Sequence, residues 1–117
     1  MTPQEIIEIP GRHERWLKKQ QGGARANFAQ MNLMGFSFDR ANLQQAKFSG
    51  SDLSRCDMSH SNLRGADMFC AVLDNADLSN ADLGEADLRG ASLRGCKFDG
   101  ANMKGADFRG GDRKSVV

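Results

Sequence analysis

The chain has 117 residues, of which 39% are hydrophobic, and 16 Lys and Arg face 15 Asp and Glu for a formal net charge of +1 at pH 7. This length predicts one domain. No segment is apolar enough over a sufficient length to span a membrane, and the N-terminus lacks the basic and apolar regions of a secretory signal. The odd count of 3 cysteines suits a reducing compartment, so we expect a cytoplasmic protein.

The first 25 residues carry helix signals. Thr2 to Glu5 have the form of a capping box with Pro3 at the first helical position. Pro10 and Gly11 then predict an interruption, and residues 12–20 form a second short amphipathic segment. This part of the chain is therefore expected to hold two short helical pieces.

From Phe28 to Phe108 every fifth residue is Leu, Phe or Met, which gives 17 consecutive matches. A helix would spread residues spaced by five around its surface, and a continuous strand would place them on alternating faces. The period is consistent only with a chain that turns within each repeat and stacks its repeats around one shared interior. The residue two positions before each large residue is nearly always small, and it is Ala in 11 of the 17 repeats. Four more repeats have another small residue there, namely Ser51, Cys56, Ser61 and Cys96, and only Met31 and Phe36 are large.

The repeat, as in Ala76 to Asn80, resembles the pentapeptide-repeat family over residues 26–110. Asp or Asn precedes most of the large residues, and both types favour turns by bonding nearby backbone groups. The resemblance implies an all-β solenoid, a right-handed quadrilateral β-helix of about four coils with about 20 residues per coil. We expect residues 1–25 to form an N-terminal helical cap, residues 26–110 the β-helix and residues 111–117 a C-terminal tail.

A cap is needed because an open first coil would expose strand edges and core. We predict that Met31 and Phe36 are enlarged to meet it. The residues expected to form this lid are Ile6, Ile7, Ile9, Trp16 and Leu17. The segment from His13 to Leu17, which precedes a Gly-containing link, also resembles leaders ahead of bacterial pentapeptide arrays.

No motif for catalysis, cofactor binding or metal binding is present in the sequence. His60 should point outward while Cys56 points inward, so their four-residue spacing does not build a metal site. Cys56 and Cys96 should lie two coils apart, about 10 Å from each other, which is too far for a disulfide. Because a filled interior leaves no cleft for a small-molecule substrate, we do not expect an enzyme.

The best candidate for a binding site is the acidic coil of residues 66–85. Phe69 and Val72 occupy slots that should point to solvent, with Cys70 between them. An uncovered Phe in an acidic belt is typical of a site for a protein partner. Two plainer explanations stay open: isolated apolar side chains are common on protein surfaces, and Arg89 could lie over the Phe69 ring. The predicted partner-binding residues are Phe69, Cys70, Val72, Asp74 and Glu85.

The C-terminal end is a candidate for self-association. After Phe108 no aromatic lid follows, so the last coil should present an open edge that a second copy could cover around a two-fold axis. Gyrase-binding members of the resembled family also pair through this end. The alternative is that Val116 and Val117 fold back as a plug and leave a monomer.

Two functions from different classes follow. The first is a non-catalytic module that binds a protein partner through a rigid β-helical surface. The second, which the resemblance implies, is mimicry of duplex DNA to bind and protect a type II topoisomerase such as gyrase. Mimicry needs a long anionic face, and the column through Ala29, Phe69 and Arg109 turns basic instead, so it ranks second. We do not expect direct binding of nucleic acid, because no face collects the basic residues into one stripe.

Overall fold

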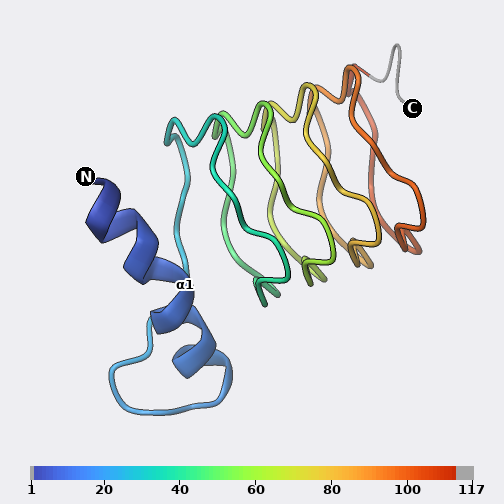
Figure 1. Cartoon of the computed structure of the whole chain (residues 1–117). Coiled ribbons are helices and arrows are strands. Elements are labelled where there is room, and N and C mark those ends of the chain that lie inside the picture. Colours follow the sequence, from blue (N-terminus) through green and yellow to red (C-terminus); the bar gives the residue numbers. More distant parts are fainter. Residues whose placement is uncertain (1, 113–117) are drawn as a thin grey trace.

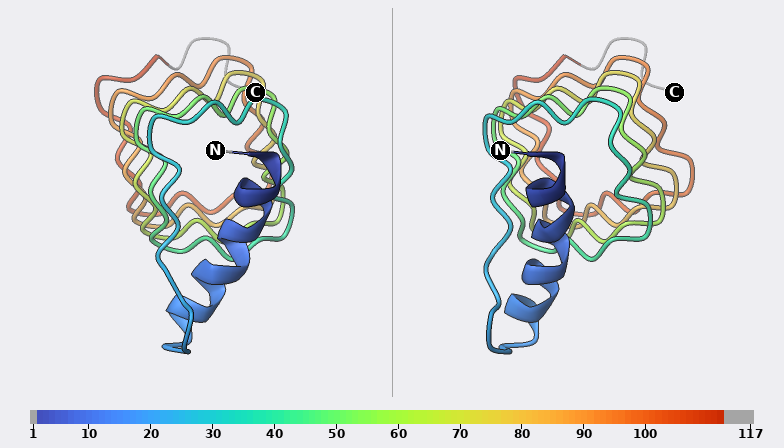
Figure 2. Two further views of the ribbon diagram at one scale, coloured as in Figure 1. Left: turned by 90° about the vertical axis from the view of Figure 1, so that its left-hand side faces the viewer. Right: turned by 60° about the vertical axis from the view of Figure 1, so that its left-hand side comes forward.

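The computed structural model describes residues 2–112 of the chain. One helix, α1 (Pro3–Leu17), lies at one end, and after a link the chain winds repeatedly around a common axis (Figures 1 and 2). In the described residues, regular strands are replaced by 14 isolated parallel bridges. The bridges run from Asn27–Lys47 to Ser92–Asp112, and each joins residues 20 apart. One turn of the chain therefore takes 20 residues, or four pentapeptides.

In coils with a neighbour on both sides, the backbone N–H groups of a repeat are all used when Asp or Asn stands before the large residue. The large residue and the second residue after it donate to the next coil, and the Asp or Asn donates to the preceding coil. The small residue closes a turn, and its partner is the carbonyl of the large residue three positions earlier. The remaining N–H donates to the Asp or Asn side chain, as Phe69 N does to Asp67 Oδ1 at 3.1 Å. The expected role of the Asp or Asn side chain in the turn is confirmed. Each backbone N–H of such a repeat thus has a hydrogen-bond acceptor.

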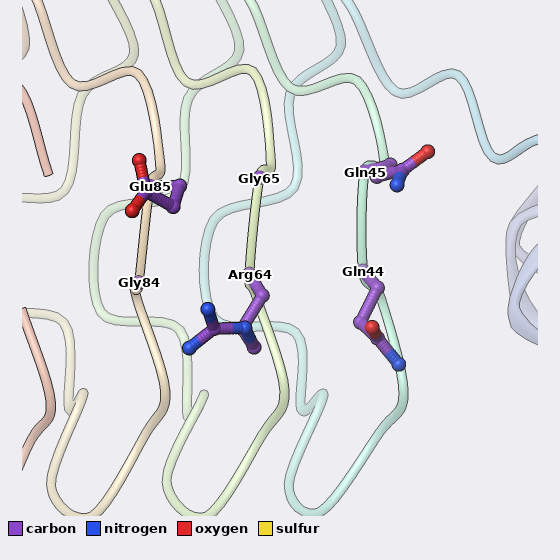
Figure 3. Close-up of a pocket in the computed structure, with 6 residues that line it drawn as sticks. All are labelled: Gln44, Gln45, Arg64, Gly65, Gly84 and Glu85. Atoms are coloured by element: carbon purple, nitrogen blue, oxygen red, sulfur yellow. The ribbon is translucent and has the colours of Figure 1, made fainter. Parts of the chain in front are cut away.

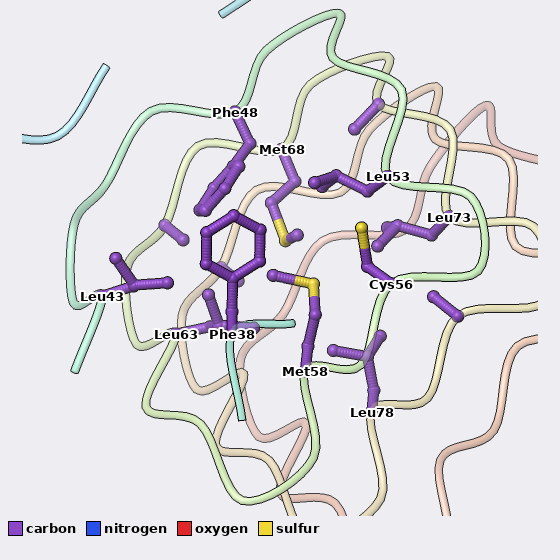
Figure 4. Close-up of a cluster of buried hydrophobic side chains, with 14 of the residues drawn as sticks. Phe38, Leu43, Phe48, Leu53, Cys56, Met58, Leu63, Met68, Leu73 and Leu78 are labelled. Carbon is purple, nitrogen blue, oxygen red and sulfur yellow. The ribbon is translucent and has the colours of Figure 1, made fainter. Parts of the chain in front are cut away.

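The large and small columns both point inward, as the period predicts (Figure 4). From Phe28 to Leu93 every large residue is buried, and the small residues from Ala46 to Cys96 are buried as well. Phe28, Phe38 and Phe48 pack against one another with ring centroids 5.0 to 6.0 Å apart. The interior is thus a filled core that no single repeat could bury alone.

The last residue of each repeat has a positive φ, which explains why glycine recurs there. Gly95 and Gly100 adopt φ of 66° and 72°, in the left-handed region where a side chain is strained. Cys70 and His60 adopt the same conformation with φ of 57° and 59°. Their side chains are therefore directed outward at corners of the coil.

Helix α1 is continuous through Pro10, so the predicted interruption is wrong. Proline removes one helical hydrogen bond, but tertiary contacts on both sides of it hold the helix together. Ile6 is buried in the core before Pro10, and His13 is buried after it. The capping box is confirmed, since Glu5 N donates to Thr2 Oγ1 at 3.2 Å and Thr2 N donates to Glu5 Oε1 at 3.1 Å.

The residues by which α1 meets the coils differ in part from the predicted lid. Ile6 is buried and Ile9 packs against the core, whereas Ile7 is 63% exposed. Trp16 and Leu17 are only half-buried and lie outside the core cluster. The predicted lid contact is therefore wrong for Ile7, and Trp16 and Leu17 add to the lid only from outside the core. The physical reason is helical geometry, because a helix crossing the rim of the coil can turn only one stripe inward.

Candidate partner-binding surface

Phe69 lies on the outside of the array and is 45% exposed. The ladder places Ser49 on one side of it and Arg89 on the other, since Gly50 N donates to Phe69 O and Cys70 N donates to Arg89 O. The guanidinium carbon of Arg89 lies 5.3 Å from the centroid of the Phe69 ring. This cation–π contact is the second of the two plainer explanations, and it covers part of the ring.

Arg89 is fixed in this position by Asp87. Its Nε donates to Asp87 Oδ1 and its Nη2 to Asp87 Oδ2, both at 2.9 Å. The bond with the Arg89 side chain lowers the pKa of Asp87, so the pair is ionised at neutral pH. Phe69, Arg89 and Asp87 therefore form a preorganised surface with an aromatic face beside a neutralised ion pair.

Cys70 is exposed next to Phe69, as predicted. Its thiol lies along Gly90, where an added Cβ would come within 2.9 Å of the Cys70 sulfur. The absence of a side chain at Gly90 thus leaves room for the Cys70 side chain on the surface.

Val72 and Asp74 lie on the side that follows Cys70, and both are half-buried. Asp74 has a structural role that the sequence analysis missed. Its Oδ1 accepts a 2.6 Å bond from Ser92 Oγ and a 3.1 Å bond from Arg94 N. Ser92 occupies the slot where Asp or Asn usually caps the turn, so Asp74 supplies that cap from the neighbouring coil.

Glu85 is not brought together with the other predicted residues. It comes three pentapeptides after Cys70, and four pentapeptides complete one coil, so it lies at a different corner. There it lines a shallow depression of about 190 Å³ that crosses three neighbouring coils (Figure 3). A cavity of this size is below the usual range for small-molecule sites. Its lining residues are Gln44, Gln45, Arg64, Gly65, Gly84 and Glu85.

The far end of the array exposes part of its core within the described residues. Met103 belongs to the inward column but is 39% exposed. Phe98 and Phe108 are half-buried and meet edge to face with centroids 6.4 Å apart. Phe108 is thus a partly covered end residue, whereas Val116 and Val117 lie outside the described residues.

The two inward cysteines are structural. Burial raises the pKa of the Cys56 thiol to about 11 and that of Cys96 to about 12, so both remain protonated. Cys56 Sγ donates to Leu33 O at 3.0 Å. His60 is exposed while Cys56 is buried, as predicted, and residues 2–112 contain no group of three or more side chains that could hold a metal ion. The same residues include no helix long and apolar enough to cross a membrane.

A model of pentapeptide repeats matches the chain over residues 24–59, 37–69 and 71–110. The chain belongs to the pentapeptide-repeat family. It is 37% identical to a pentapeptide repeat protein from Nostoc Pcc 7120, covering 99% of this chain and 84% of that one with a TM-score of 0.63. No curated protein sequence matches it.

Two further solved structures extend the likeness. The pentapeptide repeat protein Rfr23 from the cyanobacterium Cyanothece 51142 is 27% identical over 78% of this chain, with a TM-score of 0.75. One from the Arabidopsis thaliana thylakoid lumen is 31% identical over 71% of this chain, with a TM-score of 0.60. This pentapeptide-repeat chain covers only 63% and 61% of the lengths of those two proteins.

Proposed function

We propose that this pentapeptide-repeat protein is a non-catalytic interaction module that presents Phe69 and its neighbours on a rigid β-helical surface to a protein partner. The observation that carries the proposal is a 45% exposed Phe held beside a fixed Arg89–Asp87 pair. Aromatic and Arg side chains dominate the energetics of protein interfaces. Cys70 and Val72 extend the surface around the corner, while Asp74 supports it from the backbone side. Glu85 remains a candidate only for a partner that spans two corners.

The array itself favours binding over chemistry. Its interior is packed with Leu, Phe and Met, and the depression at Glu85 is shallow and polar. A partner would meet a surface whose backbone is fixed by a hydrogen-bond ladder, so binding would cost little conformational entropy.

The test is quantitative capture on immobilised protein, followed by affinity measurement with the purified partner. Phe69→Asp should weaken binding at least tenfold if Phe69 is a hot spot. Met34→Asp is the matched control, because Met34 is 51% exposed and occupies the same slot of an earlier repeat. Equal binding by wild type and Phe69→Asp, with both proteins folded, would refute the proposed site.

DNA mimicry directed at a type II topoisomerase is the second candidate. One side of the array favours it, since acidic residues recur there through the coils at Asp39, Asp57, Asp77 and Asp99. Basic partners offset part of this charge, as in the Arg40–Asp39 pair at 3.6 Å on the same side and the Arg109–Asp107 pair at 2.6 Å on another. A supercoiling assay with purified gyrase separates the candidates, because a mimic should change the activity of the enzyme and a generic module should not.

We infer a right-handed quadrilateral β-helix over residues 26–110, capped by residues 1–25 and followed by a tail at 111–117. We also infer a cytoplasmic protein that forms a homodimer through its C-terminal end. Light scattering after size exclusion tests the dimer: it should dissociate on Phe108→Lys, and a wild-type monomer at tens of micromolar would refute it.

A further inference from the structure

His13 is a fully buried side chain, with 0% of its surface exposed, at the contact between α1 and the first coil. Its Nδ1 accepts a 2.9 Å hydrogen bond from Ala26 N. Its Nε2 lies 2.7 Å from Gln44 O, which can only accept. Both bonds form together only when the imidazole is neutral and carries its proton on Nε2.

The surroundings of His13 disfavour a second proton. Trp16 stacks on the imidazole with ring centroids 5.4 Å apart, and burial lowers the pKa of His13. Arg25, in the link after α1, lowers it further through its charge, while the bond to Gln44 O acts in the opposite direction. Arg25 is itself anchored at this edge, since its Nε donates to Gln45 O at 2.6 Å. Among residues 2–112, Arg25 is the one charged side chain that shifts this group, and no carboxylate offsets it.

Protonation would change this contact from attractive to repulsive. A proton on Nδ1 would point at the N–H of Ala26, so two donors would face each other and Ala26 N would lose its acceptor. The imidazolium would also be buried beside the positive charge of Arg25. The remaining bond to Gln44 O does not compensate for both losses.

We propose that His13 is a pH-sensitive latch, whose protonation releases α1 from the first coil and uncovers the coil edge at residues 41–45. Release would free the carbonyl of Gln44 and remove Ile6 from the core. The exposed edge is then available for backbone pairing, which α1 otherwise blocks. The helix thus acts as a removable cover of the array.

The direction of the pH dependence follows from the two states. The pKa of His13 in the closed state lies below its ordinary value of 6.5, whereas in the released state it returns toward that value. The released state therefore binds more protons. The closed latch is fully stable above about pH 6.5, and each unit of pH below this raises the released-to-closed ratio up to tenfold until closed His13 itself titrates.

The experiment measures hydrogen exchange of the Ala26 amide, the donor to His13, relative to the Leu73 amide in the middle of the array. We expect the Ala26-to-Leu73 ratio of exchange rates to rise at least tenfold between about pH 7.5 and about pH 5 in the wild-type protein. The His60→Gln variant is the matched control, because His60 is exposed, and it should behave as wild type. His13→Gln should remove the rise.

The inference is overturned if His13→Gln retains the pH-dependent rise, or if the wild-type ratio stays constant. A His13→Gln variant whose latch is open at every pH would also lack the rise, so a second measurement is made on the wild-type protein. In a side-chain NMR titration, the imidazole signal of His13 must change over the same pH range in which the Ala26 amide loses its protection from exchange. Titration of His13 without loss of that protection refutes the latch.

Discussion

Within residues 2–112 the C-terminal end of the array leaves part of its core exposed. A pair of large-to-small substitutions reveals what this exposure means for stability. Leu73 and Met103 both occupy the large inward slot of their repeats, but Leu73 is fully buried and Met103 is 39% exposed. Leu73 lies between Leu53 and Leu93 of the neighbouring coils, whose backbones are fixed by the ladder. Met103 has a coil on only one side within the described residues.

The expected magnitudes differ accordingly. Leu73→Ala removes buried methyl groups from a site that cannot collapse, so the loss should reach the upper part of the usual range, about 3–5 kcal/mol. Met103→Ala removes a side chain that remains partly in water, and no closed cavity forms around it. We expect a loss of about 1–2 kcal/mol for Met103→Ala in the dilute protein.

Urea unfolding followed by circular dichroism checks both values, at low and at high protein concentration. Pairing through the C-terminal end would bury Met103, so the loss on Met103→Ala should grow with protein concentration while the loss on Leu73→Ala stays constant. Equal losses at both positions, independent of concentration, would show that the last coil is already covered and would refute this reasoning.

Three further predictions concern single sites. Trp16→Ala should cost about 1–2 kcal/mol, less than a core Trp, because the ring is half-buried; a thermal melt checks this. Ala81→Leu enters a buried slot and should cost about 1–3 kcal/mol, whereas Ser79→Leu, which loses only a bond to Asp77, should cost about 1 kcal/mol or less in the same urea assay. Asp74→Ala should cost about 1–2 kcal/mol and raise the exchange rate of the amide it caps, while Asp74→Asn should preserve most of that protection.

The inward columns could be predicted from the sequence because a period of five leaves the chain no other way to share one interior. The role of the Asp or Asn slot also followed from local chemistry, since its partner N–H is only two residues away. Features that depend on one repeat and its immediate neighbour are thus encoded in every copy of the motif.

Features that depend on one particular contact could not be predicted in this way. The burial of His13 requires Gln44 and Ala26 to meet it, and nothing in the spacing of these residues indicates that meeting. The continuity of α1 through Pro10 is decided by contacts on both sides of the proline. Asp74 is predicted for the partner surface because it lies in the acidic coil of residues 66–85, but its side chain bonds Ser92 and Arg94 N of the next coil.

The size of the array limits how a partner can bind at Phe69. A standard interface covers about 800 Å² on each side, a patch roughly 28 Å across, whereas about four coils at strand spacing extend only about 20 Å along the axis. A partner centred on Phe69 must therefore reach around the corner at Cys70 and contact two sides of the array. One of these sides presents the Arg89–Asp87 pair, and the other presents Val72. An elongated partner lying along a single side would miss one of them, so we expect a partner surface with a concave edge that seats the corner.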